Sequence, residues 1–515
     1  MFEPSLDACA RSYAAGKACF VSARLAGDLE TPVSAFLKLS AARAGRIFLL
    51  ESVEGGAARG RFSMIGLDPD IVWRVFGEKA EINRRALADL GGFSPCAGPP
   101  LAALGELIAE SRIETPDDLP PMAAGVFGYL GYDMVRQMER LAEAKPDPIG
   151  VPDAIMLRPT VMVVFDAVKD EIFVVTPLRP DRNSAFRAAH DSALERLESV
   201  VATLEGPLAQ GVHAACAGQA AGPARSNTPK ERFLEMVERA KNYIRAGDIF
   251  QVVLSQRFSA PFALPAFALY RALRRINPAP FLCYLDFGSF QIVCSSPEIL
   301  VRLRGGKVTI RPIAGTRWRG QTRAEDERLA AELLADEKEC AEHLMLLDLG
   351  RNDVGRVAET GSVEVTEKFA IERYSHVMHI VSNVEGRLAA KHDVIDALCA
   401  GFPAGTVSGA PKVRAMEIID ELEADKRGIY GGCIGYFGAA GEMDTCIVLR
   451  TAMIKEGTMY VQAGAGIVYD SDPAAEQREC VNKAQALFRA AEEAVRFAAG
   501  AKQGRRRTSS ESLRD

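Results

Sequence analysis

The hydrophobic pattern of the chain predicts many short strands in two blocks. In the first part, runs rich in β-branched and aromatic residues occur at RIFLLES, SMIGL, IVWRVF, TVMVVFD and EIFVVTP. A second block follows at FQVVLSQRF, FLCYLDF, QIVCSS, KVTIRPI, GCIGYFG, DTCIVLRTAMI and TMYVQAG. Successive short strands with tight turns indicate antiparallel sheets rather than βαβ winding.

Helices are predicted between these strands. Apolar residues recur near a 3.6-residue period over 325–347, 411–423 and 473–498. A further helix is predicted after Thr228, a good N-cap, with Pro229 at its first position. The mixture of strands and helices predicts an α+β protein.

Glycine, proline and alanine divide the chain. The stretch 205–227 is rich in these residues, has no period and is predicted to be a linker. It separates an N-terminal region, 1–204, from a C-terminal region, 228–500. The polar and charge-dense stretch 501–515 is predicted to be a disordered tail.

Composition excludes several classes of protein. The chain has 515 residues, of which 48% are hydrophobic and 25% charged, enough to bury a large core. A net charge of −6 provides no basic field for nucleic acid, and no apolar stretch approaches the roughly 20 residues of a membrane span. The start lacks the pattern of a signal peptide, so a cytoplasmic protein is expected.

The cysteine spacing suggests neither a disulfide framework nor a metal-binding motif. All eleven are scattered, and no C-x-x-C pair occurs. Several lie in apolar runs, such as QIVCSS and DTCIVL, and are interpreted as small core residues. No His/Cys cluster is therefore expected to hold a soft metal.

Two predicted helices each carry a pair of carboxylates. Glu339 and Glu342 project together, and this pair alone is more typical of a solvated acidic face. Glu476, Glu479 and Lys483 line up on the last helix, after Asp472 and Pro473 at its start. Together the pairs could hold a hard cation, and oxygen ligands favour Mg²⁺ over zinc.

Other candidate features are weaker when taken singly. The loops PIAGT, FPAGTVSGAPK and QAGAG could offer backbone N–H groups to carboxylates or phosphates, but none fits a nucleotide-binding fingerprint. Arg450 lies in an apolar strand and needs either a structural carboxylate or an anionic ligand. His379, beside an apolar run, is on its own more typical of a structural histidine.

The ordered motifs resemble a known family. LLES, SSPE, PIAGT, DEKECAEH running into LLDLGRND, HVMHIVS, FPAGTVSGAPK, GIYGGCIGY, CIVLRT and GAGIVYDSDP occur in this order. The string resembles the chorismate-utilising enzymes, and within them component I of anthranilate synthase. The resemblance is dense over 230–490 and thinner before it. It implies an α/β sandwich of two large antiparallel sheets with external helices.

The resemblance also implies a reaction, in which chorismate and ammonia give anthranilate and pyruvate with Mg²⁺, at the start of tryptophan biosynthesis. It implies Glu342 and Glu479 as direct Mg²⁺ ligands, with Glu339 and Glu476 acting through water. The metal would hold the ring carboxylate of chorismate and withdraw charge.

By the same resemblance, Glu298 is the general acid that helps the 4-hydroxyl leave. This role predicts a raised pKa, from burial and from the nearby acidic cluster. His379 is assigned to proton handling when pyruvate is eliminated, and Arg450 to the enolpyruvyl carboxylate. The implied substrate-contacting residues are Gly315, Thr316, Thr406, Tyr430, Arg450, Gly464, Ala465, Gly466 and Lys483.

Two positions distinguish members of the family. Aminodeoxychorismate synthase carries a lysine where this chain has Ala314, and the isochorismate and salicylate synthases carry one at the place of Gln251. A methyl group cannot act as a nucleophile, and a neutral amide cannot act as a base. Both residues favour ammonia as the attacking group.

Two alternative functions remain, that of aminodeoxychorismate synthase and that of a catalytically silent, tryptophan-sensing scaffold. Trp318 departs from the proline usual in the family's loop.

The resemblance implies partners and an inhibitor. The chain lacks a glutaminase nucleophile motif, so a separate glutamine amidotransferase subunit (component II) is expected to supply ammonia in a hetero-oligomer. Ser52 in LLES and the segment Pro280, Phe281 and Leu282 match the family's pocket for L-tryptophan, which implies feedback inhibition. The alternative is that LLES is only the end of a strand.

Overall fold

The computed structural model describes residues 2–41, 43, 45–54, 58–142, 145–180, 185–208, 222–374 and 377–511. Two long antiparallel strands, β4 (Ala58–Phe76) and β8 (Ala154–Asp166), form a ribbon at the centre of the fold. Their register shifts between Pro69 and Ile71, next to Asp68 with φ of 49°. This irregularity divides the ribbon into two halves, and with it one continuous hydrogen-bonded network of strands into two layers, which are called the first and the second sheet below.

The first sheet contains the end of β8 and the start of β4. β9 and β2 extend it on one side, and β3, β12, β13, β22, β23 and β11 on the other, all antiparallel. The strands of this sheet are β1 (Phe2–Glu3), β2 (Cys19–Ala26), β3 (Ile47–Glu54), β9 (Glu171–Leu178), β10 (Arg225–Ser226), β11 (Gln251–Pro261), β12 (Phe281–Asp286), β13 (Phe290–Ser296), β19 (Gly409–Ala410), β22 (Thr451–Lys455) and β23 (Thr458–Ile467).

The second sheet contains the other half of the ribbon. β5 and β6 lie on one side, and β7, β20, β21, β14, β15 and β18 follow on the other, with β16 and β17 joined to β18. Its strands are β5 (Lys79–Asn83), β6 (Ser94–Pro95), β7 (Gly125–Leu130), β14 (Ile299–Arg304), β15 (Lys307–Ile310), β16 (Ile313–Trp318), β17 (Glu364–Arg373), β18 (Val377–Arg387), β20 (Cys433–Gly438) and β21 (Met443–Ile447).

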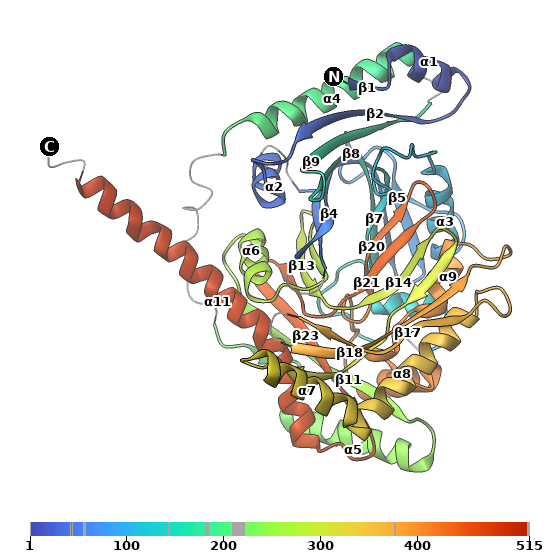
Figure 1. The fold of residues 1–515 in the computed structure, drawn as a ribbon, viewed down its shortest axis with the longest axis vertical. Helices are drawn as coiled ribbons and strands as arrows, with labels where there is room; N and C mark the ends of the chain where they lie inside the picture. The colour runs from blue at the N-terminus through green and yellow to red at the C-terminus, as the bar shows by residue number, and fades with distance from the viewer. Residues whose placement is uncertain are drawn as a thin grey trace.

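The two sheets face each other across a hydrophobic core, in which Phe48 of the first sheet stacks on Phe127 of the second with ring centroids 4.9 Å apart. Helices cover the outer faces (Figure 1). They are α1 (Leu6–Ala14), α2 (Pro32–Ser40), α3 (Pro100–Glu110), α4 (Phe186–Glu205), α5 (Lys230–Ala246), α6 (Ala266–Ile276), α7 (Arg323–Ala335), α8 (Glu337–Gly355), α9 (Val394–Gly401), α10 (Lys412–Leu422) and α11 (Pro473–Glu511), with short 3₁₀ turns at Tyr132–Gln137 and Gly405–Val407.

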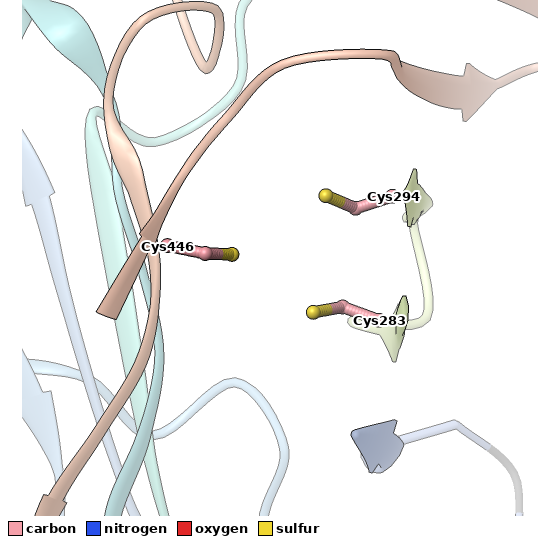
Figure 2. A group of neighbouring side chains, drawn as sticks. All are labelled: Cys283, Cys294 and Cys446. Atoms are coloured by element: carbon pink, nitrogen blue, oxygen red, sulfur yellow. The ribbon is translucent and has the colours of Figure 1, made fainter. Parts of the chain in front are cut away.

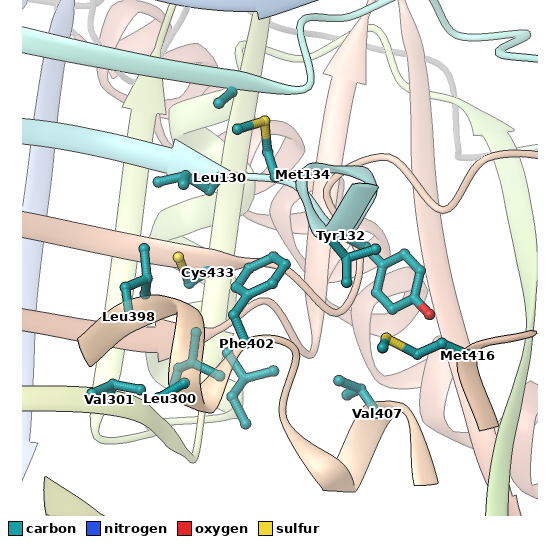
Figure 3. Close-up of a cluster of buried hydrophobic side chains, with 14 of the residues drawn as sticks. Leu130, Tyr132, Met134, Leu300, Val301, Leu398, Phe402, Val407, Met416 and Cys433 are labelled. Atoms are coloured by element: carbon teal, nitrogen blue, oxygen red, sulfur yellow. The ribbon is translucent and has the colours of Figure 1, made fainter. Parts of the chain in front are cut away.

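A large hydrophobic cluster anchors α3, α5, α8, α9 and α10. Figure 3 shows part of it, where Phe402, just after α9, lies among Leu130 and Cys433 of neighbouring strands and Val407 of the second 3₁₀ turn. Phe402 is 1% exposed. Burying such a side chain contributes roughly 1.5–3 kcal/mol, so this packing holds the 405–407 turn in place.

The expected α+β class with antiparallel sheets and external helices is confirmed. Strands from both sides of the predicted linker pair with one another, β3 with β12 and β7 with β20. The N-terminal and C-terminal regions therefore contribute to both sheets. Of the predicted linker, residues 209–221 lie outside the described residues, and Arg225–Ser226 forms β10.

Three helix predictions need correction. The helix predicted over 325–347 is two helices, because Asp336 ends α7 and its side chain accepts the Lys338 and Glu339 N–H groups that start α8. The break changes the phase of the apolar stripe, so Leu344 is 45% exposed. The N-cap of α5 is Pro229 rather than Thr228.

The third correction concerns α11, which continues to Glu511 and projects away from the body of the molecule (Figure 1). The sequence predicted a helix only to 498 and disorder over 501–515. The added residues include many Ala, Lys, Arg and Gln, which have high helix propensity. Residues 512–515 lie outside the described residues. None of the described helices is long and apolar enough to cross a membrane.

Candidate active site

A cavity of about 810 Å³, the acidic cavity, lies where β11, β16, β18 and β23 meet the first turns of α8 and α11. It gathers residues from positions 251 to 487 of the sequence. The predicted site residues that line it are Glu298, Gly315, Thr316, Glu339, Glu342, His379, Thr406, Tyr430, Arg450, Gly464, Gly466, Glu476, Glu479 and Lys483.

Two capped helix starts place the carboxylates. Asp336 caps α8 one turn before Glu339, and Asp472 accepts the Ala475 N–H at 2.8 Å at the start of α11. The first turns of both helices border the acidic cavity, and each pair lies in the first two turns of its helix. Both pairs therefore line the cavity. The helices come from distant parts of the sequence, yet their carboxylates act on one another electrostatically.

The electrostatics of the four carboxylates show crowding. Burial raises the pKa of Glu342, and the charges of Glu339 and Glu479 raise it further. Burial and the charge of Glu479 likewise raise the pKa of Glu476. Compensation is partial: Lys483 Nζ lies 2.7 Å from Glu479 Oε1, and Arg317 Nη1 lies 3.3 Å from Glu339 Oε1.

The donor set suits a hard divalent cation. The four carboxylates supply oxygen ligands, and the lining contains no cysteine among the described residues. A cation bound between the two pairs would relieve the repulsion of the carboxylates. The amide Nε2 of Gln251 donates to Glu342 Oε1 at 3.2 Å. This leaves the second carboxylate oxygen of Glu342, Oε2, for a ligand. The residues present therefore fit Mg²⁺.

Glu298 lies deep in the acidic cavity. It is 6% exposed, and burial raises its pKa to about 8. The Thr406 hydroxyl donates to Glu298 Oε1 at 3.2 Å, and this bond and the Arg450 charge oppose the rise. The raised pKa is in the predicted direction, but burial alone causes it, because the acidic cluster is not among its causes. A carboxyl with this pKa is protonated at neutral pH and can act as an acid.

A bulge in β16 orients His379. The pairing of β16 with β18 shifts between Ala314 and Thr316, where Gly315 has φ of 68°, a conformation that favours glycine. The His379 Nδ1–H donates to the Gly315 carbonyl oxygen at 2.9 Å. This assigns the proton to Nδ1 and leaves Nε2 as a base. Burial lowers the pKa of His379, which favours the neutral ring.

Arg450 interrupts the strand predicted at DTCIVLRTAMI, which is divided into β21 and β22. It has φ of 47°, a strained conformation for arginine. Its guanidinium forms no ion pair with any described residue, although burial lowers its pKa and Glu298 acts on it electrostatically. Of the two partners that the sequence suggested for Arg450, a structural carboxylate or an anionic ligand, a guanidinium without an ion pair in a cavity favours the anionic ligand.

Two glycines keep one wall of the acidic cavity open. A Cβ at Gly464 would lie 2.8 Å from Tyr430 Oη, and a Cβ at Gly466 would lie 2.6 Å from Gln251 Nε2. Ala465 between them does not line the acidic cavity. Alternation along β23 turns its methyl group into the hydrophobic cluster, where it is fully buried. Only its backbone could contact a ligand.

Trp318 stands at the rim of the acidic cavity and is 75% exposed. It belongs to β16, whose Gly315 and Thr316 remain in the cavity wall. The departure from the family's proline therefore leaves these residues in place.

A second cavity of about 610 Å³, the inter-sheet cavity, lies between the two sheets. Ser52, Pro280 and Phe281 line it, as predicted for the effector pocket, and the Ser52 hydroxyl donates to the Phe62 carbonyl at 3.1 Å. Leu282 does not line it, because alternation along β12 turns this side chain into the cluster beneath the outer helices.

Sequence reasoning missed a buried ion pair below the acidic cavity. Arg427 and Glu423 are 2.6 Å apart, and Arg427 also donates to the Val407 carbonyl at 2.6 Å and the Val253 carbonyl at 2.7 Å. The pair thus holds the turn that carries Thr406. Its i,i+4 spacing was visible in the sequence, but such spacing is common on exposed helices.

Comparisons with known proteins agree on a family. A model described as chorismate binding enzyme matches residues 65–489. Anthranilate synthase component 1 of Cereibacter sphaeroides is 58% identical over 501 residues, covering 97% of this chain and 100% of that protein. The same component of Thermus thermophilus is 50% identical, covering 90% of this chain and 96% of that protein.

Solved structures show the same fold. Anthranilate synthase component I from Streptococcus pneumoniae TIGR4 superposes with a TM-score of 0.74 at 38% identity, covering 90% of this chain and 98% of that one. The menaquinone-specific isochorismate synthase of Escherichia coli, at 20% identity and a TM-score of 0.68, covers 95% and 98%. The second likeness concerns the fold alone.

Proposed function

The chain belongs to the chorismate-binding enzyme family and, within it, to the component 1 chains of anthranilate synthase, and from that premise we propose which residues carry its reaction. The chain is the large subunit that converts chorismate to anthranilate in tryptophan biosynthesis. The observation that carries the proposal is the meeting in one cavity of two acidic pairs, the buried Glu298 and Arg450, whose guanidinium has no ion-pair partner among the described residues.

The substrate is a dianion, and the acidic cavity offers one partner for each carboxylate. Arg450 binds the enolpyruvyl carboxylate, since its guanidinium forms no ion pair within the described part of the chain. Glu342 and Glu479 would hold Mg²⁺, which would supply Lewis-acid polarisation at the ring carboxylate, and Glu339 and Glu476 would position water around it. The chorismate ring then lies beside Gly464 and Gly466, where an added Cβ would displace Tyr430 or Gln251, which also line the cavity.

Two residues handle protons. Glu298 donates its proton to the departing 4-hydroxyl, because its pKa of about 8 keeps it protonated before the reaction. The Nε2 atom of His379 accepts a proton when pyruvate is eliminated, and Gly315 holds the ring in that tautomer.

Two neutral residues in the cavity wall favour ammonia as the nucleophile. Ala314 presents a methyl group and Gln251 an amide whose Nε2 is directed to Glu342. Neither can attack the ring or deprotonate water. This supports anthranilate over the products of aminodeoxychorismate synthase and the isochorismate synthases.

The supply of ammonia and the feedback inhibition by tryptophan depend on sites outside the acidic cavity. A glutamine amidotransferase subunit, component II, releases ammonia from glutamine within a hetero-oligomer. L-Tryptophan binds the inter-sheet cavity at Ser52, Pro280 and Phe281 and inhibits the reaction. Pro297 and Ile313 line both cavities, so displacement of these residues can couple them.

The test is turnover with chorismate, Mg²⁺ and ammonium, followed by anthranilate fluorescence and chromatography. Anthranilate as product supports the proposal. Isochorismate or aminodeoxychorismate as the sole product would contradict it, and an absence of turnover would favour a silent scaffold.

The metal assignment has its own test. Glu342→Gln and Glu479→Gln should each reduce Mg²⁺-dependent turnover by more than about 100-fold, because each removes a ligand charge. Glu337→Gln, on the same helix as Glu342 but outside the acidic cavity, is the matched control and should remain active. Wild-type turnover in both ligand variants would refute the assignment.

A further inference from the structure

We propose that Cys283, Cys294 and Cys446 form a buried binding site for a soft, thiophilic cation of the Cu(I) and Zn(II) class, in the wall of the inter-sheet cavity. Their scattered positions in the sequence predict separate core residues and no soft-metal cluster. The structure brings them together from three strands.

Strand pairing explains how they meet. Cys283 of β12 and Cys294 of β13 are direct cross-strand partners, so their side chains lie on the same face of the first sheet. Cys446 comes from β21 of the second sheet and faces them across the core. Figure 2 shows the three sulfur atoms pointing toward one another from the two sheets.

The spacing matches thiolate coordination. The three Sγ atoms lie within 4.8 Å of one another, and each residue is at most 4% exposed. Three sulfurs bound to one ion at about 2.3 Å are separated by about 4 Å, so rotamer adjustments of less than 1 Å close the site. Thiolate ligands select soft cations over Mg²⁺, which separates this site from the carboxylates of the acidic cavity.

The inter-sheet cavity provides access. Cys283 and Cys446 line it, so an ion can enter from the cavity, and a cavity water can occupy a further coordination position. Each metal–sulfur bond that forms replaces an S–H bond, and the released proton leaves through the same cavity. Arg302 and Arg304, which also line this cavity, share the single carboxylate of Asp444, two residues before Cys446.

The thiols already interact before any ion binds. Burial opposes ionisation of Cys294, but hydrogen bonds with Cys283, Cys446 and Thr451 outweigh burial and lower its pKa. A hydrogen bond with Cys294 raises the pKa of Cys283, hydrogen bonds with Cys283 and Cys294 raise that of Cys446, and burial adds to both, so the three thiols share one hydrogen-bonded cluster.

The consequence for regulation rests on the proposed tryptophan site. The same cavity holds Ser52, Pro280 and Phe281, and Phe281 is two residues from Cys283 on β12. An ion bound at the thiols ties β12 and β13 to β21 across the cavity. We expect this bridge to weaken inhibition by tryptophan.

The first experiment titrates the reduced full-length protein with Cd²⁺ and follows the ultraviolet thiolate-to-cadmium charge-transfer band. One tight equivalent is expected. Cys294→Ala and Cys446→Ala should weaken it by more than about 100-fold, because even changes outside the ligand set cost 10- to 100-fold. Cys433→Ala, a buried strand cysteine outside the cluster, is the matched control and should bind like the parent. Parent-like binding in both cluster variants would overturn the proposal.

A second measurement needs no variant. X-ray absorption of the unmodified protein, loaded with one equivalent of Zn²⁺ in excess Mg²⁺, should show three sulfur neighbours at about 2.3 Å. A shell of oxygen or nitrogen only would place the ion elsewhere and overturn the site.

The regulatory step is tested last, by measuring tryptophan inhibition with and without one equivalent of Zn²⁺. Inhibition should weaken in the parent and in Cys433→Ala but not in Cys294→Ala. Metal binding without any change in inhibition would overturn the coupling and leave the thiol site intact. Failure of the Cd²⁺ titration would overturn the site and leave the proposed catalytic function intact.

Discussion

The acidic cavity and the inter-sheet cavity differ in how their charges are satisfied. In the acidic cavity, Arg450 has no ion-pair partner among the described residues, and crowding raises the pKa of Glu342. In the inter-sheet cavity the charged side chains pair with one another or with their neighbours. These pairs are Arg302 and Arg304 with Asp444, Arg311 with Glu367 and Glu372, Arg61 with Asp166, and Glu51 with Arg274.

The difference shows what each cavity can recognise. An anion and a cation would complete the electrostatics of the acidic cavity, and the proposed dianionic substrate and Mg²⁺ would supply them. The inter-sheet cavity is neutral within itself, so shape and a few polar contacts must select its ligand. Charge changes should therefore damage the first cavity far more than the second.

The largest expected effect is at Glu298. Glu298→Gln should lower kcat by about 10²- to 10⁴-fold, the usual contribution of a general acid. Glu367→Gln, which removes a charge in the inter-sheet cavity, should leave kcat near the parent value. Steady-state kinetics of the two variants measure the contrast, and equal losses in both would remove the distinction between the cavities.

The pH dependence follows from the same carboxyl. Because the acid form is required, kcat should fall as pH rises through about 8, and this fall should be absent from the residual activity of Glu298→Gln. The folded protein retains this proton more strongly than the unfolded chain, so the carboxyl lowers stability progressively between pH 4.5 and about 8. Glu298→Gln should therefore gain stability over the parent across that range, by on the order of a few kcal/mol, in denaturant titrations.

A smaller effect is expected at Arg450. Arg450→Lys keeps the charge but loses the two-pronged contact, and a charged hydrogen bond contributes about 1.5–3 kcal/mol. KM for chorismate should rise about 10- to 100-fold with a smaller change in kcat. The paired Arg302→Lys is the control in the inter-sheet cavity. A KM for Arg450→Lys that equals that of the control would mean that Arg450 does not bind the substrate.

The smallest effect is regulatory. Ser52→Phe should fill part of the inter-sheet cavity and weaken inhibition by tryptophan about tenfold, with kcat retained, since apolar ligands depend on cavity volume. Ser52→Ala removes only the hydroxyl that donates to Phe62 and serves as the control. Inhibition assays at fixed chorismate give the comparison, and unchanged inhibition in Ser52→Phe would place the effector elsewhere.

Local features of both cavities could be predicted from the sequence. The acidic pairs follow from helical spacing and from caps such as Asp472, which depend only on near neighbours. Their meeting in one cavity was not visible from either helix. It depended on the resemblance, because the helices start more than 130 residues apart. The break at Asp336 was missed because the periodicity on both sides of it appeared continuous.

Two of the predicted site residues do not line the cavities, because of an alternation that the sequence already contained. Ala465 and Leu282 lie in strands that were predicted, and period-2 geometry turns both side chains away from the cavities. The convergence of Cys283, Cys294 and Cys446 was beyond sequence reasoning. It depends on cross-strand register and on the packing of one sheet against the other, which no local pattern encodes.

The placement of the two tryptophans gives the enzyme a built-in optical reporter. Trp73 is fully buried, whereas Trp318 stands exposed at the rim of the acidic cavity. Anthranilate absorbs light in the region where indole emits, so product held in the acidic cavity should quench the fluorescence of Trp318 at its rim. Occupancy of the unlabelled protein can thus be followed in real time from its own emission.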